Sequence, residues 1–194
     1  RDGEVVWDAK DAKEGITSIH EIHPELKIVL SVGGWGADGF SQAARTQEGR
    51  EKFAASALEI VKKYGLDGVR KTLDAYKEGM FVTTAVGGDV YFALQTDMKA
   101  ASEYLDYVQL MTYDLQGGFQ MVTGHHAALY HSEGNLFDAC VEKAVNGFAN
   151  AGVPMEKLIL GVPFYSRKWD GVKGAGCRNG LGMEASTVGG YGGD

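Results

Sequence analysis

The sequence has few cysteines and no long apolar run. Its two cysteines, Cys140 and Cys177, lie far apart, so they predict neither a metal-ligand cluster nor a disulfide framework. Cys140 falls in a helical pattern and is predicted to be a small buried hydrophobic residue. No apolar run approaches the ~20 residues that a membrane-spanning helix needs. The chain is therefore expected to be a globular domain without a metal site.

Basic residues are also in the minority. The chain has 19 Lys and Arg against 26 Asp and Glu, which gives a formal net charge of −7, and no Lys/Arg-rich stripe is visible. Neither nucleic acid nor an anionic membrane surface is an expected partner. A hydrophobic content of 44% is ordinary for a globular protein and allows a sizeable core.

Short apolar runs alternate with longer helical patterns along the chain. Strands are expected at residues 27–32, 66–69, 80–86, 107–113 and 157–165. Helices are expected at residues 48–64, 96–104 and 135–150. The strand runs are apolar on both faces and their connections are long, which is typical of a parallel sheet covered by helices.

Two α/β folds fit this pattern, an open doubly wound sheet and a (β/α)8 TIM-type barrel. No G-x-G-x-x-G follows a strand, so the dinucleotide-binding fingerprint is missing. Several expected strands instead end in polar or aromatic residues, and chemistry spread over many strand ends is typical of a barrel. These residues are Ser31, Trp35, Asp67, Tyr113, Asp114, Tyr165 and Arg167. We predict a single barrel domain over residues 1–194.

One interval between expected strands is too short for a barrel. About 14 residues separate Leu66 from Met80, although a βα unit of a ~250-residue barrel takes roughly 30 and the crossover alone at least ~10–12. We expect a segment to be missing between Val69 and Leu73, near residues 70–71. The chain is also too short for eight units, so further strands are expected before its first residue and after its last.

The first motif, at residues 31–36, reads S-V-G-G-W-G. Ser31 ends an expected strand, and Gly33 and Gly34 form the turn. The simplest interpretation is a glycine turn followed by a core or surface aromatic. At the mouth of a barrel, however, the flat face of Trp35 could stack on a pyranose ring, because it offers a large contact area with few rotatable bonds.

The second motif, at residues 109–114, reads Q-L-M-T-Y-D. Alternation along the strand puts Gln109, Met111 and Tyr113 on one side, predicted to be the barrel interior. These residues could simply fill the barrel, with Asp114 capping the strand end. A Tyr hydroxyl and a carboxylate at the catalytic end could also hold an amide group.

Taken together, the motifs SVGGW, LDGV, QLMTYD and GVPFYSR resemble the successive strand ends of glycoside hydrolase family 18, the chitinase family. The resemblance runs from about Leu26 to the end of the chain. It implies retaining, substrate-assisted hydrolysis of N-acetylglucosamine polymers. One enzyme acid protonates the glycosidic oxygen, and the 2-acetamido oxygen of the substrate attacks the anomeric carbon.

The resemblance also implies roles for individual residues. Tyr113 would hydrogen-bond the acetamido group, and Asp114 would position the distorted sugar. The candidate catalytic residues are Tyr113, Asp114 and Asp67, with Asp67 in a supporting place. The candidate substrate-binding residues are Trp35, Met111, Tyr165 and Arg167. The candidate supporting residues are Ser31, Gly33, Gly34 and Gln109.

The family's signature strand, D-G-x-D-x-D-W-E, is only partly present. Asp67 and Gly68 match its start, and the final Glu, which is the general acid, is not found. The departure falls where the strand spacing predicts a missing segment.

A chitinase-like hydrolase is the leading hypothesis. The alternatives are a non-catalytic lectin of the same fold and a hydrolase of peptidoglycan-type N-acetylglucosaminyl polymers. We expect no cofactor and no metal ion, because neither His20 with His23 nor His125 with His126 is completed by a carboxylate or Cys cluster. The expected protein is a secreted monomer that binds chitin or N-acetylglucosamine oligosaccharides.

Overall fold

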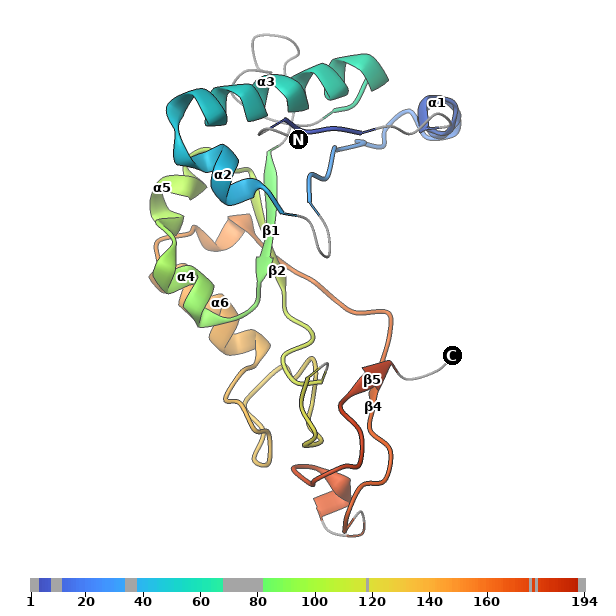
Figure 1. Cartoon of the computed structure of the whole chain (residues 1–194), viewed down its shortest axis with the longest axis vertical. Helices are drawn as coiled ribbons and strands as arrows, with labels where there is room; N and C mark the ends of the chain where they lie inside the picture. The colour runs from blue at the N-terminus through green and yellow to red at the C-terminus, as the bar shows by residue number, and fades with distance from the viewer. Residues whose placement is uncertain are drawn as a thin grey trace. The chain divides into compact units, whose positions relative to one another are not determined.

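The computed structural model describes residues 4–7, 12–33, 38–67, 82–117, 119–174, 176 and 178–191. The chain divides into two compact units, Arg1–Val82 and Thr83–Asp194 (Figure 1). Within the described ranges, no helix has both the length and the apolar content to span a membrane.

The N-terminal unit contains three helices in its described part, α1 (Ala12–Ile22), α2 (Phe40–Arg45) and α3 (Gln47–Tyr64). Helix α3 confirms the helix expected at residues 48–64. The hydroxyl of Thr46 accepts a hydrogen bond from Gly49 N at 3.0 Å and caps its first turn. Gly65 ends it with φ 68°, a left-handed conformation that glycine adopts without a Cβ penalty.

The inner face of α3 builds the core of this unit. Its buried side chains pack together with Leu66 and with the partly buried Ile28 and Leu30. The buried members are Ile60, Val61, Tyr64 and Leu66. Ile28 and Leu30 alternate with the exposed Val29 and Ser31, so this segment presents one face to the helix, as a strand does.

The strand expected at residues 27–32 is nevertheless wrong, because residues 26–33 have no regular secondary structure. Asp67 N donates to Ile28 O at 2.7 Å, and this single bond does not make a ladder. Leu66 and Asp67 are likewise irregular, and the rest of the strand expected at 66–69 lies outside the described residues.

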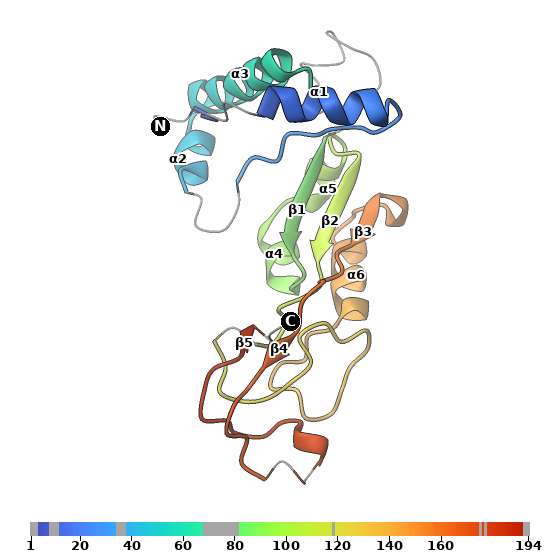
Figure 2. The same ribbon diagram turned by 90° about the vertical axis from the view of Figure 1, so that its right-hand side faces the viewer.

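The C-terminal unit is built on a parallel sheet. In the described part of the chain its strands are β1 (Thr83–Gly87), β2 (Tyr107–Met111) and β3 (Leu158–Leu160), in the order β1-β2-β3. Helices α4 (Val90–Gln95) and α5 (Met98–Ser102) connect the first two strands, and α6 (Val141–Asn150) precedes the third. The views in Figures 1 and 2 show these helices against one face of the sheet. Strands that neighbour one another in chain order fit a barrel better than a doubly wound sheet, whose order reverses at a switch point.

Strand β2 separates its two faces cleanly. Val108 and Leu110 are 0% exposed and pack with Phe148 and other apolar residues of the helix layer. Gln109 and Met111 point to the other face and are exposed. The alternation predicted from the sequence is therefore confirmed within β2, with Gln109 and Met111 on the face away from the helices.

Several element boundaries differ from the expected ones. The expected strands at 80–86, 107–113 and 157–165 are shorter and become β1, β2 and β3, the last preceded by the 3-10 helix η1 (Met155–Lys157). The expected helix at 96–104 is only α5, because Asp97 caps a new helix there by accepting from Ala100 N at 3.0 Å. The preceding helix α4 has its own cap at Asp89, which accepts from Phe92 N at 3.1 Å.

The helix expected at 135–150 begins only at Val141. Residues 135 and 136 are held by other segments instead, since the Asn135 side chain accepts from His125 N and Leu136 N donates to the Gln116 side chain, both at 2.9 Å. Cys140 immediately precedes α6 and is 1% exposed, so its predicted burial is confirmed.

The C-terminal residues form a two-stranded antiparallel ribbon, β4 (Arg167–Lys168) with β5 (Gly190–Tyr191), joined by a loop that includes the 3-10 helix η2 (Arg178–Gly180). This loop approaches the segment that follows β2 very closely. A Cβ added to Gly189 would lie 2.2 Å from Gly117 O, so only glycine fits there. The ribbon fixes the position of Arg167, which belongs to the candidate site.

Candidate functional site

A compact cluster of polar and aromatic side chains forms beyond the carboxyl ends of β2 and β3. Asp114, three residues past β2, receives the Tyr165 hydroxyl on Oδ2 at 2.6 Å. Arg167 donates from both Nε and Nη2 to Asp114 Oδ1 at 2.8 Å. Segments about 50 residues apart in the sequence therefore meet at one carboxylate, at the edge of the sheet where parallel α/β proteins place their chemistry.

Asp114 is held in an unusual backbone conformation. Its φ is 57°, in the left-handed region that costs a non-glycine residue about 1 kcal/mol or more. Such strain persists only where surrounding contacts fix the conformation. Leu115 N donates to His126 O at 3.0 Å immediately after it. The backbone and the carboxylate of Asp114 are thus both fixed by contacts from distant segments.

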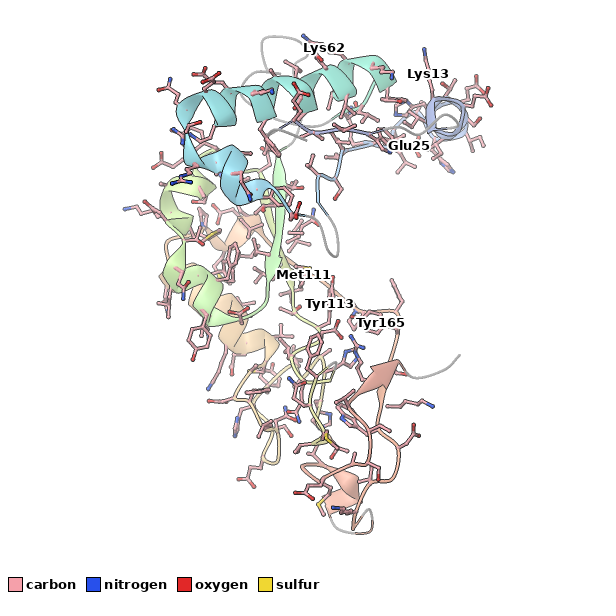
Figure 3. All side chains as sticks on the ribbon, viewed as in Figure 1. Lys13, Glu25, Lys62, Met111, Tyr113 and Tyr165 are labelled. Atoms are coloured by element: carbon pink, nitrogen blue, oxygen red, sulfur yellow. The ribbon has the colours of Figure 1, made fainter. Side chains whose placement is uncertain are left out.

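Aromatic rings surround Tyr165. The rings of Tyr113 and Tyr165 meet edge to face, with centroids 6.2 Å apart at 83°. Figure 3 shows these two side chains close together just past the end of β2. The His126 ring lies 5.5 Å from the Tyr165 ring, and Arg167 Cζ lies 5.5 Å from the centroid of Tyr165. Tyr165 is therefore oriented by ring contacts as well as by its hydrogen bond.

The cluster holds Asp114 ionised and Tyr165 neutral. Partial burial by itself would raise the pKa of Asp114, but hydrogen bonds from Tyr165 and Arg167 and the charge of Arg167 lower that pKa below its usual value. Burial, followed by the hydrogen bond to Asp114, raises the pKa of Tyr165. At neutral pH the cluster is thus a fixed carboxylate anion that accepts the hydroxyl hydrogen of a neutral phenol.

The lowered pKa of Asp114 makes a prediction about acid stability. Because the folded-state pKa lies below the unfolded value of about 3.8, Asp114 stabilises the fold fully above that value and ceases to do so as the pH falls through the folded pKa. We expect Asp114→Asn to reduce stability at pH 7 and to flatten the acid side of the stability curve. Urea unfolding of both proteins between pH 2 and 7 measures this. If the free energies of unfolding of the two proteins fall in parallel as the pH is lowered, the prediction is wrong.

Asp67 is buried in the N-terminal unit and is 4% exposed. Its Oδ2 accepts from Ile28 N at 3.1 Å and lies 3.5 Å from His20 Nε2, while Oδ1 lies 3.5 Å from Lys27 Nζ. Its described partners belong to the protein itself. These contacts fix the backbone at residues 27–28, and the supporting role of Asp67 in the site stays a prediction.

The Asp67 contacts predict a clear effect on stability. Replacing Asp67 by Ala leaves Ile28 N without its buried acceptor, which costs about 1–3 kcal/mol. Urea denaturation at pH 7 would show this as a lower midpoint with an unchanged slope. Glu25→Ala is the control, since the Glu25 carboxylate is 71% exposed and pairs only with His23 among its described contacts. If Asp67→Ala lowers the urea midpoint no more than Glu25→Ala does, the structural role given to Asp67 is wrong.

The remaining predicted site residues fall into two groups. Ser31 and Gly33 belong to the N-terminal unit, where they help line an open cavity. Gln109, Met111, Tyr113, Tyr165 and Arg167 belong to the C-terminal unit. The common location predicted for Ser31 and Asp67 with Tyr113 and Tyr165 stays a prediction, because the two pairs belong to different units. Gly34 and Trp35 lie outside the described residues, so the stacking role of Trp35 also stays a prediction.

The sequence interpretation overlooked two residues of this region. His126 was not among the predicted site residues, but its side chain is 17% exposed and Nδ1 lies 3.5 Å from Asp114 Oδ1. Gln116 is 1% exposed and hydrogen-bonded on both ends of its amide. Nothing in the local sequence marks either residue, because their partners come from elsewhere in the chain. Among the described residues, no group of three His, Cys, Asp or Glu could hold a metal ion.

Comparison with known proteins shows which family the chain belongs to. The family model for glycosyl hydrolases family 18 matches residues 1–70 and 69–190. The chain belongs to this family. Among its relatives, chitinase A1 of Niallia circulans is 31% identical over 207 residues, which cover 83% of the chain and 29% of that protein. Chitinase B of Serratia marcescens is 28% identical and matches 88% of the chain and 49% of that protein. The chain thus spans less than half the length of these two relatives.

Solved structures of similar proteins share the fold. An N-acetylglucosaminidase of this family from Paenibacillus barengoltzii superposes with a TM-score of 0.89 and 36% identity, covering the whole chain and 67% of that structure. Chitinase ChiA74 from Bacillus thuringiensis gives a TM-score of 0.80 at 28% identity over 93% of the chain and 35% of that structure. The predicted TIM-type barrel is confirmed as a partial one, a parallel sheet with helices that is not closed within the described residues.

The alignments to chitinase A1 and chitinase B contain residues that this chain lacks. The match to chitinase A1 runs over 207 residues, more than the 194 of the whole chain, although it covers only 83% of it. The family model is matched in two segments that meet at residues 69 and 70. The predicted break between Val69 and Leu73 falls at this junction and lies outside the described residues, so it stays a prediction.

Proposed function

We propose that the full-length protein is a retaining, substrate-assisted glycosidase that cleaves β-1,4-linked N-acetylglucosamine polymers. The observation that carries this proposal is the cluster beyond β2 and β3, in which an ionised Asp114 is fixed by Tyr165 and Arg167 with Tyr113 alongside. Its relatives, chitinases and an N-acetylglucosaminidase, support the same class of substrate.

The geometry suits the acetamido chemistry of such a substrate. When the acetamido oxygen attacks the anomeric carbon, positive charge develops on the resulting oxazolinium-like ring. A carboxylate held ionised, as Asp114 is, stabilises that charge and helps to position the distorted sugar. The Tyr113 hydroxyl would orient the acetamido oxygen, and Met111, on the same face of β2, would line the bottom of that subsite. Tyr165 and Arg167 would flank the cleft, with Arg167 holding Asp114 in place.

The proposal requires a general acid, which the 194 residues do not supply in the expected motif. We place it in a segment of the full-length protein between Val69 and Leu73. The two-segment match to the family and the longer alignments of the relatives support this placement. A protein that had lost the general acid in evolution would show a point substitution at that position. The strand spacing instead indicates that half a βα unit is missing.

A lectin of the same fold is the second candidate, and the missing Glu is the observation that favours it. Such a protein would keep the sugar-binding cluster and bind N-acetylglucosamine oligomers without cleaving them. A hydrolase acting on peptidoglycan-type N-acetylglucosaminyl polymers is a third candidate, which differs from the first in substrate and not in chemistry.

Two measurements on the full-length protein separate these candidates. Intact mass spectrometry should give a mass well above the 20.8 kDa of the 194 residues. Chromogenic chitooligosaccharides of one to three sugars should then be hydrolysed with retention at the anomeric carbon. Binding without hydrolysis would point to the lectin, and cleavage of peptidoglycan fragments in place of chitooligosaccharides would point to the third candidate. Hydrolysis by a protein of only 20.8 kDa would refute the placement of the acid.

A further inference from the structure

The side chain of Gln116 joins three backbone segments beneath the cluster. Its Nε2 donates to Val122 O at 2.9 Å and to Thr123 O at 3.0 Å. Its Oε1 accepts from Leu136 N at 2.9 Å. The residue is 1% exposed. Its amide group therefore makes these hydrogen bonds inside the protein and is not available to a ligand.

The segments that Gln116 joins carry the side chains of the cluster. Asp114 precedes Gln116 by two residues, and His126 follows Thr123 by three. Leu115 N donates to His126 O at 3.0 Å, so the two segments also meet through their backbones. A displacement of Gln116 would therefore move Asp114 and His126 relative to each other.

The packing around Gln116 is tight enough to transmit such a displacement. A Cβ added to Gly124 would lie 2.2 Å from Gln116 Cδ, so the glycine leaves the space that the amide fills. The strained backbone of Asp114, with φ 57°, needs neighbours that hold it in place. Gln116 is the nearest fully buried side chain that follows it in the sequence.

We infer that Gln116 is a positioning residue, which holds the 114–116 and 122–126 segments together so that the Asp114 carboxylate stays aligned with Tyr165 and Arg167. It touches neither substrate nor reacting atoms and acts through Asp114. The effect on turnover rests on the proposed function, whereas the effect on the Asp114 carboxylate does not. A shift of about 1 Å at a catalytic group can lower the rate about 100-fold.

The test compares Gln116→Met with Asp114→Asn and the double variant in the full-length protein. Met keeps the length of the side chain but removes the two N–H donors and the carbonyl acceptor. We expect Gln116→Met to lower kcat by about 10- to 100-fold, with KM changed much less. Added to Asp114→Asn, it should lower kcat little further, because both changes act through the same carboxylate. A purely structural role would make the two effects multiply, and that outcome overturns the inference.

A second measurement does not depend on activity. Asp114→Asn should flatten the acid side of the stability curve in the parent but change it little in the Gln116→Met background, where Asp114 has lost its alignment. An equal change in both backgrounds overturns the inference even if the parent has no glycosidase activity. If the parent is inactive while this coupling is present, the proposed function fails and the positioning role stands.

Matched variants complete the design. Gln120→Met removes a hydrogen bond of the same loop, the one that Gly117 N donates to Gln120 Oε1 at 2.8 Å. It should leave the Asp114 coupling intact, because it does not join the 122–126 segment. If Gln116→Met does not fold, Gly124→Ala displaces the amide without removing it, and the same loss of coupling is expected. Intact coupling in folded Gly124→Ala overturns the inference.

Discussion

Replacing Tyr113 by Phe in the full-length protein is expected to lower kcat by about 10²–10³-fold, with a much smaller change in KM. Tyr113 belongs to the Q-L-M-T-Y-D motif and lies two residues past the end of β2, and its ring is held edge to face against Tyr165. Phe keeps this ring contact and removes only the hydroxyl. The proposed partner of that hydroxyl is the acetamido oxygen, which gains importance only as it attacks the anomeric carbon. A hydrogen bond that strengthens toward the transition state acts on kcat.

Steady-state kinetics on a chromogenic N-acetylglucosamine oligomer measures the Tyr113→Phe effect. Trp35→Ala provides a contrast, because it removes stacking area that ground state and transition state share. It should mainly raise KM on long oligomers. Equal kcat values for Tyr113→Phe and the parent would remove Tyr113 from the mechanism. A Trp35→Ala variant with an unchanged KM on long substrates would remove the stacking platform.

The second large effect concerns stability. Phe148 lies on the inner face of α6, is 0% exposed, and packs with Val108, Leu110 and Met98 behind the sheet. Its ring also stacks on Phe92, with centroids 6.3 Å apart. Phe148→Ala removes this burial and leaves a cavity between α6 and β2, which costs about 3–5 kcal/mol. The loss should appear chiefly as faster unfolding if α6 docks late in folding.

Equilibrium urea unfolding of the full-length protein measures the Phe148→Ala effect. Phe119→Ala deletes the same atoms from a side chain that is 79% exposed, and it should change stability by less than about 0.5 kcal/mol. If Phe148→Ala and Phe119→Ala have similar midpoints, the core described behind β2 does not hold the unit together.

The features that the sequence predicted well depend on near neighbours in the chain. Helix α3 follows a 3.6-residue apolar pattern and carries its own cap at Thr46. The two faces of β2 follow from strict alternation, which placed Gln109 and Met111 on one side and Val108 and Leu110 on the other. In each case the signal and the structure span the same few residues.

The features that the sequence missed depend on distant partners. Helix α6 starts at Val141, later than expected, because Asn135 and Leu136, the residues expected to begin it, are hydrogen-bonded to His125 and Gln116. The ring of His126 contacts the ring of Tyr165, about 40 residues away, so the local sequence does not reveal this contact. The carboxylate of Asp114 was predicted from its motif, but its bonds to Tyr165 and Arg167 join segments about 50 residues apart, which no local pattern reveals.

The close approach of Gly189 to Gly117 has a consequence for large-scale mutagenesis. Any side chain at position 189 would collide with rigid backbone, 2.2 Å from Gly117 O and 2.6 Å from Gly117 C. A deep mutational scan scored on growth or turnover would therefore rank position 189 beside the catalytic positions, although it carries no chemical group. Scoring the same library for folded protein separates the two classes, because substitutions at Gly189 would deplete the folded population whereas Tyr113→Phe would not.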